Sequence, residues 1–398
     1  MRNKAIFTNE SSYRKLHGKI FASLLNQFGP KYVHEIEDAI HNAFYKSLKS
    51  WKSDKQPENY ENWLFIVARN DLLNQIKKKN QFHFQTLATE KGDELFSDED
   101  LRLKTILFLT QVASVSNKSK VVFILKNIFG LHVKEISQCT LLSHDAIYKT
   151  IKRAHKDFEK NIDTNRLETA FERASGKEIT IVEEILYAVF NMGFDSFSDK
   201  SSSLVDEEIC LEALALTKML WNIYELNTTR NLLALFCFHL SRLPEKVKND
   251  KILSFFDQDK TKWNGQFISL GFHYLEKPDR LNQYYLESLI ISRHMTTEQF
   301  DQNHWNEIID LYQLLLAHNN SPVIKLNLCF CLSKAERTNE ALELLNVIEH
   351  ELPAEHLYFA LVKANISEGL NKRSDELVKN ALKHITQKIR RSYILDNL

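Results

Sequence analysis

The sequence predicts an all-α protein, and three observations support that prediction. Only 9 Gly and 6 Pro occur among 398 residues, fewer than the tight turns of a sheet-rich protein usually need. Hydrophobic residues make up 43% of the chain, which is enough to build packed cores. Apolar residues recur at helical spacing along most of the chain. The length predicts two or three domains rather than one.

Residues 1–80 are expected to form a first domain of three amphipathic helices, the first and second separated by a break at Gly29-Pro30. Each helix has one apolar face. These faces are Leu16, Ile20, Leu24, Leu25 and Phe28 in the first helix, Ile36, Ala39, Ile40, Ala43, Phe44, Leu48 and Trp51 in the second, and Leu64, Val67, Ala68, Leu72 and Ile76 in the third.

The remaining chain is expected to contain a linker, a second domain and a long extension. Residues 81–100 are polar and acidic, which is typical of a linker between small domains. A second helical cluster covers residues 101–162. After a probable boundary at Ser175-Gly176-Lys177, amphipathic helices fill an extension over residues 180–398.

The extension contains a weak internal repeat. Its period is 34 residues, as in tetratricopeptide repeats built from paired helices. Chance recurrence among generic amphipathic helices is the alternative. The repeated positions are Leu332, Ala335, Leu344 and Ile348, which recur as Ile366, Gly369, Val378 and Leu382.

Charge divides the chain into a basic and an acidic part, although the net charge is zero. Residues 1–160 hold 26 Lys+Arg against 18 Asp+Glu, and residues 161–398 hold 26 against 34. A basic segment followed by an acidic one favours a part that binds a polyanion and a part that does not. Ordinary variation in surface charge is the alternative.

The best local motif is a helix-turn-helix over residues 131–158. Ile136 in a short first helix and Ile147 in the second are spaced to pack together, and Ser137 is small enough for close crossing. Ser143 is placed to cap the second helix. That helix should expose a basic face with one aromatic residue, as insertion into the major groove requires. The face consists of Tyr148, Lys149, Lys152, Arg153 and Lys156.

The third helix of the first domain provides a second signal, because it ends in Lys77-Lys78-Lys79. Lysines at a helix C-terminus interact favourably with the helix dipole, and that effect alone explains many such endings. The functional alternative is contact with phosphates, while Asn70, Asn74 and Gln75 on the polar face contact bases.

Taken in order, these segments resemble the extracytoplasmic-function sigma factors of bacterial RNA polymerase. Residues 37–51 are similar to their polymerase-binding helix, residues 63–79 to the helix that melts and reads the −10 element, and residues 118–158 to the −35 reader. The extension resembles that of the sigma-factor group with a long tetratricopeptide-like C-terminal region, in patches that run in family order. These patches are Phe190 to Phe194, Phe256 to Trp263, Tyr285 to His294, and Ser321-Pro322-Val323 with Leu326-Asn327.

The resemblance implies a role for particular residues. Core polymerase is expected to contact Asp38, Asn42 and Phe44, the −10 region Asn70, Asn74, Lys77, Lys78 and Lys79, and the −35 duplex His144, Tyr148, Lys149, Lys152 and Arg153. Trp51 and Trp63 are expected to be core aromatics rather than DNA-stacking ones. Departures from the family pattern mean that promoter preference does not carry over. They are Met192, Lys260, Thr110-Gln111-Val112, Asn74, Lys77 and Leu141.

No enzyme, cofactor or metal site is expected. The chain contains no GxxxxGK, GxGxxG, HExxH or GxSxG motif, and its 15 histidines show no ligand spacing. The five cysteines form no CxxC pair and lie in apolar helical patterns, which indicates buried thiols in a reducing compartment. No signal peptide or stretch of about 18 apolar residues occurs, so a cytoplasmic protein without a membrane partner is expected.

The predicted function is therefore that of a sigma factor that binds core RNA polymerase and promoter DNA, reads the −10 and −35 elements and aids promoter opening. The acidic extension is expected to modulate activity, either by covering the basic part or by contacting polymerase or a regulatory partner. Two alternatives stay open: a helical scaffold that binds peptides, and a helix-turn-helix regulator that acts without core polymerase.

Overall fold

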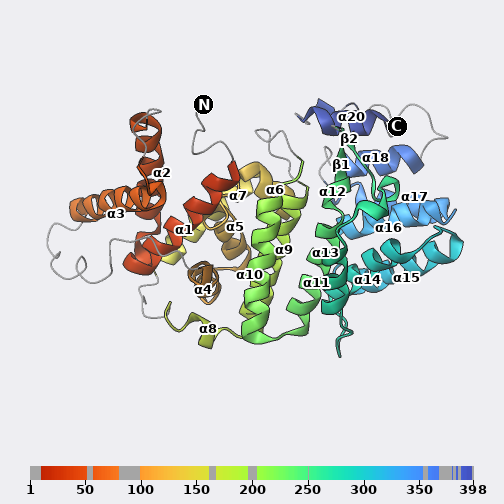
Figure 1. The fold of residues 1–398 in the computed structure, drawn as a ribbon, viewed down its shortest axis with the longest axis horizontal. Coiled ribbons are helices and arrows are strands. Elements are labelled where there is room, and N and C mark those ends of the chain that lie inside the picture. The colour runs from red at the N-terminus through yellow and green to blue at the C-terminus, as the bar shows by residue number, and fades with distance from the viewer. Residues whose placement is uncertain are drawn as a thin grey trace. The chain divides into compact units, whose positions relative to one another are not determined.

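The protein is all-α, as predicted. Helices dominate the computed structural model, and the strands among the described residues are one antiparallel pair, β1 (Val247–Lys248) and β2 (Lys251–Ile252). The chain forms two compact units: unit 1 combines residues 1–193 with 211–223, and unit 2 combines 194–210 with 224–398 (Figure 1). The structure describes residues 10–51, 57–79, 99–160, 167–195, 204–249, 251–352, 357–366, 379, 382–383 and 387–396.

Unit 1 contains the elements that the sequence assigns to DNA and polymerase contacts. Its helices are α1 (Glu10–Phe28), η1 (Pro30–Tyr32), α2 (Val33–Ser50), α3 (Tyr60–Lys79), α4 (Glu99–Thr110), α5 (Asn117–Asn127), α6 (Val133–Thr140), α7 (His144–Glu159), α8 (Ala170–Arg173), α9 (Gly176–Phe194) and most of α10 (Glu207–Tyr224).

The break between α1 and α2 lies where the sequence predicts it, at Gly29, whose φ of 82° favours glycine. A second glycine sets the approach of α1 to the end of α5. A Cβ on Gly18 would collide with the carbonyl oxygen of Ile128, so only glycine fits this crossing. Arg102 on α4 donates to the same carbonyl oxygen at 3.2 Å, which ties a third helix to the contact.

The buried face of α2 is the predicted one except at Leu48 and at Trp51, which caps the end of the helix and is half-buried. Ile36, Ala39, Ile40 and Ala43 are fully buried, but Leu48 is 72% exposed. The prediction for Leu48 was wrong because Ser47, four residues after Ala43, continues the buried face. The next residue is rotated by about 100° around the helix and so points to solvent.

The predicted segment boundaries differ from the division into units. The linker at 81–100 lies outside the described residues except for the start of α4. The predicted start of the extension at residue 180 falls inside α9, which belongs to unit 1. There the Cys139 thiol on α6 lies 3.8 Å from the Ala188 carbonyl oxygen, and Arg102 pairs with Glu212 on α10. Two helices of the predicted extension thus complete the N-terminal core.

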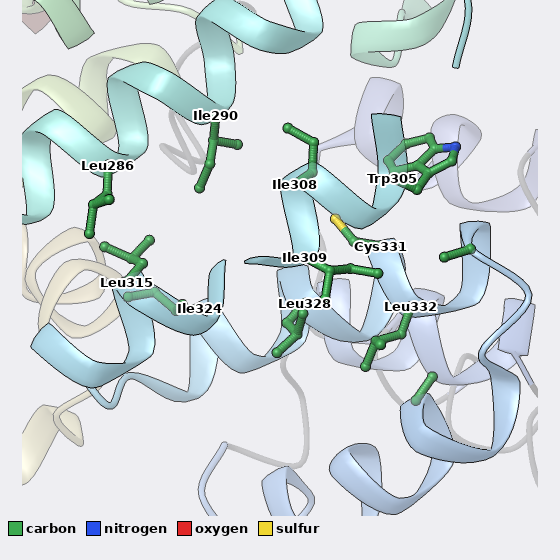
Figure 2. Packing of buried hydrophobic residues seen from close by; sticks show 12 residues of the cluster. Leu286, Ile290, Trp305, Ile308, Ile309, Leu315, Ile324, Leu328, Cys331 and Leu332 are labelled. Atoms are coloured by element: carbon green, nitrogen blue, oxygen red, sulfur yellow. The ribbon is translucent and has the colours of Figure 1, made fainter. Parts of the chain in front are cut away.

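Unit 2 consists of helices that pack on their sequence neighbours. A core cluster joins α14, α15, α16 and α17 through Leu286, Ile308, Leu328, Leu332 and other buried residues (Figure 2). The 34-residue recurrence includes positions outside the described residues, so tetratricopeptide character stays a prediction. The elements are α11 (Asn227–Ser241), α12 (Leu243–Lys246), β1, β2, η3 (Phe255–Asp257), η4 (Lys260–Lys262), α13 (Gly265–Tyr274), α14 (Gln283–Thr296), α15 (Gln302–His318), α16 (Pro322–Lys334), α17 (Thr338–Ile348), α18 (Leu357–Ile366) and α20 (Lys388–Asp396).

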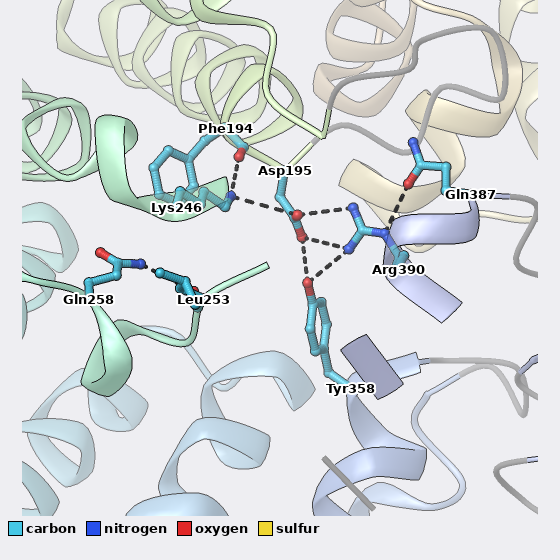
Figure 3. Close-up of polar contacts among 8 residues, drawn as sticks. All are labelled: Phe194, Asp195, Lys246, Leu253, Gln258, Tyr358, Gln387 and Arg390. Atoms are coloured by element: carbon cyan, nitrogen blue, oxygen red, sulfur yellow. Dashed lines mark hydrogen bonds and ion pairs between the residues drawn. The ribbon is translucent and has the colours of Figure 1, made fainter. Parts of the chain in front are cut away.

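An ionic cluster around Asp195 holds the C-terminal helices of unit 2 (Figure 3). Arg390 on α20 donates to Asp195 Oδ1 at 3.0 Å, and the Tyr358 hydroxyl on α18 donates to Oδ2 at 2.6 Å. The Lys246 ammonium on α12 lies 3.7 Å from the same carboxylate. Three side chains distant in the sequence therefore converge on the Asp195 carboxylate, and the removal of one residue of this cluster would leave the others with an incomplete set of partners.

Two further features of the described chain concern its surroundings. No helix in the described ranges combines the length and apolar character needed to cross a membrane. All five cysteines are free thiols and four of them are buried, as the apolar helical patterns predict.

Candidate nucleic-acid interface

Helices α6 and α7 form the predicted helix, turn and helix. The Ser143 hydroxyl caps α7 by accepting a hydrogen bond from the Ala146 amide at 3.3 Å, as its position predicts. The Ser137 hydroxyl donates to the Leu142 carbonyl at 2.6 Å, which fixes the turn to α6. Ile136 and Ile147 are fully buried. Between them Leu141 adopts a φ of 55°, where glycine is the favoured residue.

The outer face of α7 is basic and exposed. Ile147, Ala154 and Phe158 are fully buried on the inner face. Every predicted −35 contact is exposed. The four lysine and arginine side chains of this face form no ion pair with another described residue. A row of unpaired cations on one helix face is what phosphate contacts require. These residues are His144, Tyr148, Lys149, Lys152, Arg153 and Lys156.

The predicted −10 residues divide into two groups on α3. Asn70, Asn74, Lys77 and Lys78 are exposed. Lys79, although largely exposed, forms an ion pair with Glu35 on α2, and this contact raises the pKa of Lys79. The charge of Lys79 is therefore partly engaged within the protein.

The predicted polymerase-binding residues on α2 lie in different environments. Asp38 and Asn42 are exposed, and Asn42 donates to Asp71 Oδ2 on α3 at 2.9 Å. Phe44 is only 6% exposed and its ring lies 4.5 Å from that of Tyr13. The assignment of Phe44 as a partner contact is therefore corrected: it is a core residue, because its helix position points toward α1.

The sequence pattern missed two apolar side chains on the same exposed surface of α2. Tyr45 is 57% exposed and Leu48 is 72% exposed. Tyr45 lies seven residues after Asp38, two helical turns away, so the two share a face. A short exposed stripe with a carboxylate, an amide and two apolar groups is suited to a protein contact.

Trp51 and Trp63 contact each other, but they are half-buried and not part of the buried core. Their ring centroids lie 5.0 Å apart at 60°, and both side chains are half-buried. The pair connects the end of α2 to the start of α3.

Polar contacts hold α5, α6 and α7 against α1 and α2. Arg14 donates to both carboxylate oxygens of Glu135 at 2.8 and 2.9 Å, with both side chains buried. His17 contacts the Asn127 carbonyl oxygen at 3.2 Å. Burial, together with His41 and Lys126, lowers the pKa of His17 to about 4. Helix α7 also meets α2 directly, where His155 Nε2 lies 3.2 Å from Glu37 Oε2.

Comparison with known proteins yields two similarities. A family of unknown function, DUF6596, matches residues 178–278, which run from α9 to α13. An uncharacterized protein of Rhizobium meliloti (strain 1021) is 25% identical over 344 residues, covering 82% of this chain and 80% of that protein. No solved structure matches the chain. The likeness to the rhizobial protein therefore extends over most of the chain, and neither similarity assigns an activity.

Proposed function

We propose that this protein is a sigma factor of the extracytoplasmic-function type, which binds core RNA polymerase and directs it to promoters. The observation that carries the proposal is the exposed basic face of α7 in a capped helix-turn-helix. Lys149, Lys152, Arg153 and Lys156 provide four cations on that face. If all four contact phosphates, the logarithm of DNA affinity should fall with the logarithm of salt concentration at a slope of roughly −3 to −4.

The other two surfaces of unit 1 support the same proposal. The exposed amides and lysines of α3 offer base and phosphate contacts, as melting and capture of the −10 element would need. The stripe of α2 that contains Asp38, Asn42, Tyr45 and Leu48 offers a contact for polymerase. A regulator that acts without polymerase would have no use for either surface.

The proposal also requires a change within unit 1. Promoter elements about two helical turns of DNA apart are separated by roughly 70 Å. Helices α3 and α7 share one compact unit in the present arrangement. We infer that α4 to α7 move away from α1 to α3 when both elements are read, and that the contacts of Arg14 and His17 break at that step.

The C-terminal helices are proposed to modulate this activity. A truncation that tests their role has to preserve α9 and α10, because these helices pack in unit 1. Removal of residues 225–398 would separate the two outcomes. Increased transcription would indicate that the removed part restrains unit 1, and loss of transcription would indicate that it is needed for polymerase or partner contact.

The deciding experiment is run-off transcription with purified core RNA polymerase, the full chain and the promoter region of its own gene. We expect a specific transcript that the Lys152→Ala/Arg153→Ala variant does not produce. Arg173→Ala/Lys177→Ala is the matched control, because it removes two exposed cations from unit 1 outside α7. If there is neither transcript nor co-elution with polymerase, the sigma-factor proposal is wrong and the helical scaffold is favoured.

A further inference from the structure

Three potential metal ligands gather where α2 meets α7. His34 and Glu37 lie one turn apart on α2, and His155 comes from α7. One ligand atom from each of the three residues lies within 4.8 Å of the other two. His155 Nε2 and Glu37 Oε2 are 3.2 Å apart, and the ring centroids of His34 and His155 are 5.6 Å apart.

The ion pair between Glu37 and His155 and the ring contact between His34 and His155 account for part of this arrangement, but in the described part of the chain two polar atoms are left without a partner. Glu37 Oε1 and His155 Nδ1 are both buried and find no hydrogen-bond partner among the described residues. A buried polar atom without a partner costs about 1–3 kcal/mol. A group that binds here and engages the carboxylate would therefore remove a cost that the protein alone carries.

The ligand set matches a first-row divalent cation. Two imidazoles and one glutamate are a common zinc set with a fourth position left open. Ligand atoms around tetrahedral Zn²⁺ lie roughly 3.3 Å apart, given bonds of about 2.0–2.2 Å. Glu37 and His155 already have that spacing. His34 is exposed, so its side chain can rotate toward the other two ligands.

The surrounding charges leave Glu37 available as a ligand. Glu35, the neighbouring carboxylate on α2, is paired with Lys79. Burial lowers the pKa of Lys126 on α5, and the negative charge of Glu37 opposes this shift only in part. Among the described residues Glu37 forms no ion pair with a lysine or arginine, and its ion-pair partner there is His155.

We propose that His34, Glu37 and His155 form a binding site for Zn²⁺ or a similar divalent transition metal, which clamps α7 to α2. The site rests on geometry and not on the proposed function. Because α2 and α7 come from segments more than a hundred residues apart, an ion bound to both would stabilise their contact.

Binding is tested by titrating the reduced full-length protein with Zn²⁺ against a chromophoric chelator. We expect one equivalent to bind, with affinity at least about tenfold lower in His34→Ala and Glu37→Gln. His34 is exposed, so its replacement should preserve the fold. His41→Ala is the matched control, an exposed histidine on the same helix, and should bind as the wild type does. Equal affinity in all four proteins, or no binding in the wild type, would overturn the site.

The clamp is tested separately by amide hydrogen exchange. Zn²⁺ should slow exchange in α2 and α7 of the wild type and have no such effect in His34→Ala. Binding without slower exchange would overturn the clamp while leaving the site. Neither measurement involves transcription, so failure of the sigma-factor proposal would be recognised independently.

Discussion

The ion pair between Arg14 and Glu135 offers the sharpest test of how unit 1 is held together. It joins α1 to α6 across 121 residues of sequence, with side chains 6% and 2% exposed. Arg14→Met retains most of the buried alkyl chain but leaves the Glu135 carboxylate without its cation. Removal of one partner of a buried pair typically costs about 3–5 kcal/mol. With a urea m-value of roughly 3 kcal/mol/M, the midpoint should fall by roughly 1–1.7 M.

The measurement is native-state hydrogen exchange resolved to peptides of α1 and α6, because tryptophans occur in both units and fluorescence would mix them. Glu135→Gln is the partner variant, since its amide oxygen can still accept from the His132 amide as Glu135 does at 2.8 Å. The double variant should cost less than the sum of the singles, because neither charge is then left alone. If Arg14→Met lowers the free energy of unfolding by less than about 1 kcal/mol, α6 does not dock on α1 in solution and the reasoning fails.

Three further predictions follow from single groups. The pKa of His17 is lowered from 6.5 to about 4, so the unfolded chain binds this proton at a higher pH than the folded chain does. The free energy of unfolding of unit 1 should therefore fall by about 3 kcal/mol as pH falls from 6.5 to 4. The urea midpoint of His17→Gln should depend less on pH over that range. Burial alone would raise the pKa of Asp195, but Lys246 and Arg390 outweigh burial and lower it from 3.8 to about 2. The ionised Asp195 carboxylate therefore stabilises unit 2 above pH 3.8, and about 2 kcal/mol of unfolding free energy should be lost by pH 2. Calorimetry should find unit 2 of Asp195→Asn less stable at neutral pH and without this dependence on acid. Leu141→Gly should stabilise α6 and α7 by up to about 1 kcal/mol in thermal unfolding, because glycine relieves the left-handed strain, whereas a similar gain in Leu141→Ala would contradict that cause.

The helices could be predicted from the sequence because their signals are local. The buried face of α2, the break at Gly29 and the cap at Ser143 each depend on residues within one or two turns. Predictions failed where a distant segment decides the outcome. Phe44 is different: helical spacing already placed it on the buried face of α2, where Tyr13 covers it, and its assignment as a polymerase contact came from the family resemblance instead.

The candidate metal ligands show the same limit in another form. His34 and Glu37 stand three residues apart, a spacing that alone is common on helix surfaces. The third ligand, His155, becomes a neighbour only when α7 packs on α2. No local spacing within α2 or α7 therefore predicts a metal at this position. The assignment of α9 and α10 to unit 1 was missed for a similar reason, because partners such as Arg102 and Glu212 lie far apart in the chain.

The two faces of α7 make the proposed roles compatible. Lys149, Lys152 and Arg153 point outward while His155 and Phe158 point inward, so DNA can reach the basic face without disturbing the contact with α2. Binding of an isolated −35 duplex should therefore tolerate the closed arrangement. Use of both promoter elements should not, because only separation of α7 from α2 and α3 provides the required span. A cation bound to His34, Glu37 and His155 would oppose that separation, so it would restrain two-element promoters more than it restrains duplex binding by α7 alone.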